Sequence, residues 1–212
     1  METLEGSVVT LPYHAPETPV QVALMIAALS VDDGGRIEFA YRFAAAAHDG
    51  QTRDEGTPFI EHPVRVARIL WEEFGSRDVD VVVAALNHDV LEDCDWLNAE
   101  VLNSALGEVA TALIEHVTKE YVPQDKKAAR DRAYLDRLWE IPPQAQLLKL
   151  ADRLDNLRSV VHSGNPDKAG RYLTVSRDEF IPLALATDPV AAWLIGDACD
   201  EIERYLEADG GG

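Results

Sequence analysis

The most constraining feature of the sequence is an apolar run that ends in a cluster of ionisable side chains. Residues 79–86 contain a single polar residue, Asp80. The next seven residues carry an imidazole and three carboxylates: His88, Asp89, Glu92 and Asp93. A run this apolar predicts a buried helix, and not a surface helix. Because charged groups at the end of a buried helix are unfavourable unless something compensates them, the pattern predicts a binding partner such as a divalent cation.

The spacing of these four residues indicates a possible chemistry. His88 and Asp89 offer a metal ion a neutral nitrogen and a hard oxygen. On a helix, Glu92 follows His88 by one turn, and Asp93 follows Asp89 by one turn. Metal ligands with carboxylates one turn away suit hydrolysis by a metal-activated water. A lone His-Asp pair is more often structural or solvated, so a metal site requires further ligands.

Two residues elsewhere in the chain are candidates for the missing ligands. His62 precedes or opens a helix that is expected to continue to Gly75. Asp152 belongs to a narrow polar stripe on a leucine-rich helix. The stripe consists of Lys149, Asp152, Asn156 and Ser159. Each candidate also has a structural alternative, namely an ordinary histidine for His62 and an ion pair within the helix for Asp152.

Charge and composition exclude several classes of protein. The net charge of −19 argues against nucleic acid or an anionic membrane as the main partner. The apolar runs are shorter than a membrane span requires, and the N-terminus lacks the pattern of a signal peptide. Cys94 and Cys199 are too few for a disulfide framework. We therefore expect a cytoplasmic protein.

The periodicity predicts an all-α protein with roughly eight to eleven helices, because no useful strand alternation or glycine-rich phosphate loop occurs. Residues 1–17 are expected to form an irregular arm, followed by a single domain over residues 18–208. Near the N-terminus, Thr18 is predicted to cap a helix over residues 18–29. A turn is predicted over residues 32–35, which contain two adjacent glycines.

Two further helix boundaries are predicted later in the chain. Asn98 is expected to cap a short helix that ends at Gly107. Residues 168–208 are expected to form two helices with a break near residues 187–189.

The order His62, His88-Asp89, Asp152 resembles the pattern of the HD phosphohydrolases. The flanking residues narrow the resemblance to the alarmone hydrolases, the (p)ppGpp-degrading half of the Rel/Spo homologue family. Four segments within residues 37–160 resemble motifs of that family: residues 48–63, 87–93, 116–119 and 149–158. The chain looks like the small stand-alone hydrolase form, with an HD-domain helical bundle.

The resemblance implies an activity and a set of site residues. It implies release of pyrophosphate from the 3′ position of guanosine alarmones, leaving GDP or GTP. It implies one Mn²⁺ per chain, held by four ligands: His62, His88, Asp89 and Asp152. It implies that Glu92 and Asp93 activate or orient the attacking water. It also implies three residues of a nucleoside pocket: Arg53, Asn156 and Ser159.

Three positions depart from the family pattern. Asp54 stands where most relatives have lysine, Asp155 replaces a usual histidine or tyrosine, and Cys94 replaces a usual threonine. The reversed charge at Asp54 suggests relaxed purine selectivity, with adenosine alarmones cleaved as well, because stacking by Arg53 does not read ring substituents. The competing interpretation is that backbone groups of the loop read guanine and that Asp54 points to solvent.

Two other functions remain as alternatives. One is an HD hydrolase that acts on another phosphorylated nucleotide, such as NADPH. The other is a non-catalytic regulator that binds a nucleotide or a partner, against which the intact pair of Glu92 and Asp93 argues. A role as antitoxin to a toxic alarmone synthetase is compatible with the enzyme hypothesis.

Overall fold

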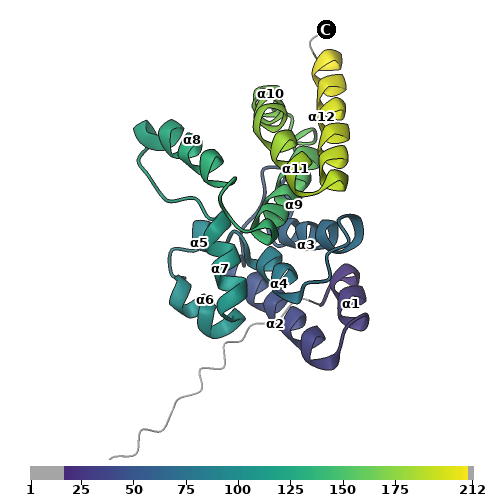
Figure 1. The fold of residues 1–212 in the computed structure, drawn as a ribbon, viewed down its shortest axis with the longest axis vertical. Coiled ribbons are helices and arrows are strands. Elements are labelled where there is room, and N and C mark those ends of the chain that lie inside the picture. Colours follow the sequence, from purple (N-terminus) through teal and green to yellow (C-terminus); the bar gives the residue numbers. More distant parts are fainter. Residues whose placement is uncertain (1–16, 210–212) are drawn as a thin grey trace, which may run out of the picture.

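The structure, a computed structural model, describes residues 17–209 and consists of helices and loops in that range (Figure 1). The only β-type pairing among these residues is an isolated bridge between Thr52 and Pro58. The prediction of an all-α protein is therefore confirmed. The predicted N-terminal arm lies, apart from Glu17, outside the described residues. No helix in the described range is long and apolar enough to cross a membrane.

The first two helices differ from the sequence prediction at their starts. Helix α1 (Val20–Ala27) has Pro19 as its N-cap and no side-chain capping bond, so the predicted cap by Thr18 is wrong. Helix α2 (Val31–Ala47) already contains residues 32–35, so the predicted turn is wrong. Ser30 caps α2 by accepting a hydrogen bond from the backbone of Asp33. This cap provides a helix start that two glycines do not override.

The next helices carry the first candidate ligands. Helix α3 (Glu61–Arg68) contains His62 in its first turn and runs into a π-helical turn (Ile69–Glu73). The chain then reverses at Gly75, whose φ of +69° favours glycine. Helix α4 (Val79–Asn87) buries seven of its nine residues, as its apolar run predicted. His88 and Asp89 separate α4 from the short helix α5 (Val90–Asp93).

The remaining helices largely follow the predicted boundaries. Asn98 caps α6 (Ala99–Leu106) through its side chain, and α7 (Glu108–Val117) follows Gly107. A 3-10 turn (Gln124–Lys126) and five further α-helices follow: α8 (Lys127–Arg137), α9 (Pro143–Val160), α10 (Pro166–Val175), α11 (Ile181–Thr187) and α12 (Pro189–Asp209). A π-helical turn (Ser176–Phe180) joins α10 to α11, and the predicted break near residue 188 separates α11 from α12.

Helix α9 is the central element of the arrangement. It packs against α3, α4 and α7 on one side and against α10, α11 and α12 on the other. Figure 1 shows α9 between these two groups, with α8 projecting from the rest of the molecule. Ten of its eighteen residues are buried, including Asp152 and Asp155. Because α9, α3 and α4 pack together, polar groups on their facing sides can meet in the interior.

Candidate metal centre

The candidate ligands lie within or at the ends of four helices: α3, α4, α5 and α9. His62 lies in the first turn of α3, and His88 forms the C-cap of α4. Asp89 follows as the N-cap of α5, and Asp152 lies in the middle of α9. Both imidazoles are almost completely buried, with 1% of His62 and 2% of His88 exposed.

Three of these residues form a group that can hold a metal ion. Potential ligand atoms of His62, His88 and Asp89 all lie within 4.8 Å of one another. The Nε2 of His62 is 3.5 Å from Oδ2 of Asp89, and the Nε2 of His88 is 3.2 Å from Oδ1 of Asp89. Two nitrogens and a carboxylate therefore converge on one point.

Asp152 directs one carboxylate oxygen at the same point and forms an ion pair with a lysine through its other oxygen. Its Oδ1 lies 3.2 Å from Nε2 of His62 and 3.6 Å from Nε2 of His88. Its Oδ2 lies 2.6 Å from Nζ of Lys149, which is the ion pair that the sequence offered as the structural alternative. The ion pair therefore does not prevent Asp152 from facing the two imidazoles, because the two contacts use different oxygens of the carboxylate.

The chemistry of this donor set fits a divalent cation. The Nδ1 of His88 lies 2.8 Å from the backbone oxygen of Ala85, to which it can donate a hydrogen bond. Its Nε2 is buried and makes no hydrogen bond within the described part of the chain. A buried polar atom without a partner is unfavourable, and a metal ion would satisfy it. Two nitrogens with carboxylate oxygens suit Mn²⁺ or Fe²⁺ better than a closed structural zinc site.

Oppositely charged groups in the cluster shift the pKa values of one another. Burial opposes protonation of His62, but hydrogen bonds with Asp152, Asp155 and Asp89 outweigh it and raise its pKa well above the ordinary value. Burial opposes ionisation of Asp152, but Lys149 and the two imidazoles hold the pKa of that carboxyl well below its usual range. The metal-free cluster therefore keeps protons that a divalent cation would displace.

The two proposed catalytic carboxylates lie on α5, beside the cluster. Glu92 accepts a hydrogen bond through Oε1 from the backbone nitrogen of Lys119, at 2.8 Å. Burial and the nearby charges of Asp89 and Glu92 raise the pKa of Asp93 to about 6. In the metal-free protein this carboxyl can therefore exchange a proton near neutral pH.

A group of basic residues borders the site on the side of α8. The Nζ atoms of Lys119 and Lys149 lie 5.0 and 5.5 Å from the ring centre of Tyr134. Next to them is a hollow of about 430 Å³, lined in part by Lys126 and Arg130. Lys126, just before α8, is exposed, and Arg130 of α8 is half-buried.

The predicted nucleoside residues also lie together. An Nη atom of Arg53 donates a hydrogen bond to Oδ1 of Asn156, at 2.8 Å, and Asn156 in turn donates to Oδ1 of Asp152. Ser159 joins Arg53 and Asn156 in lining a hollow of about 10 Å³. This volume holds about one water molecule, so the hollow is too small for a purine base in this arrangement.

Asp155 is a residue near the site whose role the sequence did not predict. It accepts hydrogen bonds from His62 and Arg65, which are 93 and 90 residues away in the chain. Its place in the sequence, three residues after Asp152, puts it on a neighbouring face of α9. No local pattern indicated which helix that face meets.

Fold and site together define an all-α protein of the HD type, with imidazole and carboxylate groups converging from α3, α4 and α9. The chain belongs to the HD domain family, whose sequence model matches residues 40–188.

Curated relatives share sequence with most of this region. A protein of Vibrio cholerae named guanosine-3′,5′-bis(diphosphate) 3′-pyrophosphohydrolase is 37% identical over 149 residues, which cover 68% of this chain and 21% of that protein. The Danio rerio protein of the same name with the suffix MESH1 is 42% identical over 123 residues, which cover 56% of this chain and 65% of that protein. The chain therefore matches less than two thirds of the length of either relative.

The fold is also similar to that of a solved structure described as "A metazoan ortholog of SpoT hydrolyzes ppGpp and plays a role in starvation responses". The TM-score is 0.67, with 23% sequence identity, over 89% of this chain and 98% of that one. At this identity, the likeness supports the all-α fold.

Proposed function

We propose that this protein is a metal-dependent phosphohydrolase that removes the 3′-pyrophosphate of guanosine alarmones, yielding GDP or GTP and pyrophosphate. The observation that carries the proposal is the convergence of His62, His88 and Asp89, in which the buried Nε2 of His88 makes no hydrogen bond among the described residues. The names of the Vibrio cholerae and Danio rerio relatives support the choice of substrate.

The proposed cofactor is one Mn²⁺ per chain, with His62, His88, Asp89 and Asp152 as ligands. A bound Mn²⁺ would lower the pKa of a coordinated water and neutralise phosphate charge. Lys149 has a separate role, because its ion pair with Oδ2 of Asp152 leaves Oδ1 directed at the two imidazoles. Asn156 restrains the same carboxylate through its hydrogen bond to Oδ1.

Glu92 and Asp93 are proposed to orient the attacking water and to accept its proton. The hydrogen bond from the backbone of Lys119 holds one oxygen of Glu92 and leaves Oε2 available to a water molecule. In the metal-free protein, burial and the charges of Asp89 and Glu92 raise the pKa of Asp93 to about 6. A Mn²⁺ held by Asp89 would lower this pKa and favour the carboxylate form that accepts a proton.

The basic side of the site is proposed to bind the phosphates. The net charge of −19 would repel an alarmone, which is itself highly anionic, unless cations gather where it binds. Lys119 and Lys149 gather beside Tyr134, and burial together with the charge of Lys149 lowers the pKa of Lys119. Bound phosphate groups would relieve this repulsion between neighbouring ammonium groups.

Arg53, Asn156 and Ser159 are proposed to hold the nucleoside after the loop opens. Arg53 would exchange its hydrogen bond with Asn156 for a stacking contact with the purine. Cleavage of adenosine alarmones and a partnership with an alarmone synthetase remain predictions from the sequence.

The test is a substrate panel with metal-free protein, with and without added Mn²⁺. We expect no turnover after chelation and restored release of pyrophosphate from ppGpp when Mn²⁺ is returned. Parallel reactions with ppApp and NADPH measure selectivity, and anion-exchange chromatography separates the products. Full activity in metal-free protein would refute the proposed cofactor, and turnover of NADPH alone would refute the proposed substrate. A preference for ppGpp over ppApp above about 10³-fold would rule out a relaxed purine pocket.

A further inference from the structure

One candidate ligand is held by a carboxylate that is not itself a candidate ligand. The Nδ1 of His62 lies 2.6 Å from Oδ2 of Asp155. Asp155 is buried, with 2% of its surface exposed, so little water competes for this contact. When Nδ1 donates to a carboxylate, it is Nε2 that gives up its proton and offers a lone pair to a metal ion. That nitrogen faces Asp89 and Asp152, at 3.5 and 3.2 Å.

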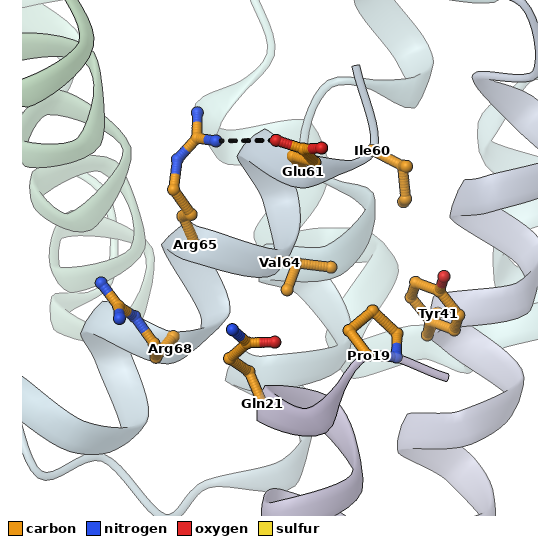
Figure 2. Close-up of a pocket in the computed structure, with 8 residues that line it drawn as sticks. All are labelled: Pro19, Gln21, Tyr41, Ile60, Glu61, Val64, Arg65 and Arg68. Carbon is orange, nitrogen blue, oxygen red and sulfur yellow. Dashed lines mark ion pairs between the residues drawn. The ribbon is translucent and has the colours of Figure 1, made fainter. Parts of the chain in front are cut away.

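Arg65 also holds Asp155 in place. Its Nε donates to Oδ1 of Asp155 at 2.7 Å, and an Nη atom donates to Oδ2 at 3.1 Å. A two-point contact of this kind fixes the plane of the carboxylate as well as its position. Figure 2 shows Arg65 on α3 beside Glu61, with which its guanidinium forms a 3.7 Å ion pair. His62 and Arg65 thus belong to one helix, and both bind the same residue of α9.

The second imidazole lacks such an arrangement. The Nδ1 of His88 lies 2.8 Å from the backbone oxygen of Ala85, a neutral acceptor on its own helix. A carboxylate polarises an imidazole more strongly than a carbonyl does and makes its other nitrogen a better electron donor. The two histidines are therefore oriented by partners of different charge, and this difference can be tested.

We propose that Asp155, clamped by Arg65, is a positioning residue that fixes the tautomer and ring orientation of His62 and strengthens it as a metal ligand. The inference rests on the proposed function, because it assumes that His62 binds the metal. Asp155 is one of the positions where the chain departs from the pattern of the family it resembles, and Arg65 supplies the positive charge that makes a buried carboxylate tolerable there.

The decisive experiment measures binding of Mn²⁺ alone, by calorimetry on metal-free protein. Asp155→Asn preserves the shape of the side chain and removes its charge. We expect Mn²⁺ to bind this variant about 10–100-fold more weakly, the usual effect of losing a partner of a metal-ligating histidine. The kcat at saturating Mn²⁺ should return towards the wild-type value, whereas damage to the fold would lower kcat at every Mn²⁺ concentration.

Two variants of α3 provide a matched comparison. Arg65→Gln should weaken Mn²⁺ binding in the same direction but less, because Asp155 keeps its contact with His62 and loses only its clamp. Arg68→Gln, nearly one turn further along α3, removes an equal charge that contacts Glu72 and not Asp155, so it should bind Mn²⁺ like the wild type. Because Arg65 is partly exposed, its variant tests the proposal even if Asp155→Asn fails to fold.

The outcomes separate this inference from the proposed function. Wild-type affinity in a folded Asp155→Asn protein would overturn the positioning role and leave the metal site standing. If that variant does not fold, equal affinities of the Arg65→Gln and Arg68→Gln proteins would overturn it. A wild-type protein that takes up no Mn²⁺ would overturn both. A protein that binds Mn²⁺ and shows the expected losses, but cleaves no alarmone, would overturn the proposed substrate alone.

Discussion

Asp54 and Lys168 form an ion pair that ties the loop carrying Arg53 to α10, with 2.5 Å between Oδ2 and Nζ. This hydrogen bond and the charge of Lys168 lower the pKa of Asp54. The residues lie 114 positions apart in the sequence. The structure therefore shows that the carboxylate of Asp54 has a cationic partner, Lys168. Neither interpretation of Asp54 from the sequence, relaxed purine selectivity or a side chain that points to solvent, had included this partner.

This ion pair should influence substrate entry. The hollow proposed for the nucleoside holds only about 10 Å³, and opening of the loop that carries Arg53 would enlarge it. An exposed ion pair contributes about 0.2–1 kcal/mol, which corresponds to at most about a fivefold change in an equilibrium. We expect Asp54→Asn to lower KM for ppGpp by up to about fivefold with kcat unchanged. The charge-swapped double variant, Asp54→Lys with Lys168→Asp, should restore the wild-type KM, and a persistent decrease would contradict this role.

Glu92 should matter for chemistry rather than for metal retention. Glu92→Gln removes the charge but keeps the oxygen that accepts the hydrogen bond from the backbone of Lys119. We expect kcat to fall by about 10²–10⁴, the range for losing an acid-base group. Metal analysis should still find about one Mn²⁺ per chain. If the variant loses its metal but keeps kcat at saturating Mn²⁺, Glu92 is a ligand and its assignment here is wrong.

Asp93 should make the stability of the metal-free protein depend on pH. Its folded pKa of about 6 lies above the ordinary value of 3.8, so the folded state favours the protonated form. The carboxylate therefore destabilises the fold above pH 6, and this penalty shrinks as pH falls from 6 towards 4. After allowance for solvent screening, we expect Asp93→Asn to stabilise the protein at pH 8 by about 1 kcal/mol.

The corresponding rise in Tm is about 2–4 °C for a protein of this size. Thermal unfolding in the presence of a chelator, at pH 8 and at pH 5, measures it. The rise should be clearly smaller at pH 5, and an equal rise at both pH values would show that the carboxylate charge is not its cause.

The two glycines of α2 should respond in opposite ways to replacement by alanine. A Cβ on Gly34 would lie 3.0 Å from Cγ2 and 3.2 Å from the backbone oxygen of Ile26, whereas a Cβ on Gly35 meets nothing within 4 Å. Gly35→Ala should raise the free energy of unfolding by about 0.5–1 kcal/mol through helix propensity. Gly34→Ala should lower it, because the backbone of α1 must shift. Chemical denaturation of both variants checks the contrast, and stabilisation by Gly34→Ala would contradict the close packing.

The sequence by itself determined which segments form helices and which of them are buried. The apolar run before His88 predicted α4, and Asn98 and Gly107 marked the ends of α6, because periodicity and capping act within a few residues of the chain. The order of His62, His88, Asp89 and Asp152 in the sequence also directed attention to the residues that the structure places together.

The tertiary structure decided which buried helix faces pack against each other. Gly34 looked like a turn residue, but it lies in α2 because Ser30 caps the helix. The backbone oxygen of Ile26 in α1 lies only 3.2 Å from where a Cβ of Gly34 would stand. The contacts of Asp155 with His62 and of Asp54 with Lys168 join residues about a hundred positions apart. A helical period indicates which side of a helix is buried but not which helix faces it. The partners of these two carboxylates therefore follow from the packing of α3, α9 and α10.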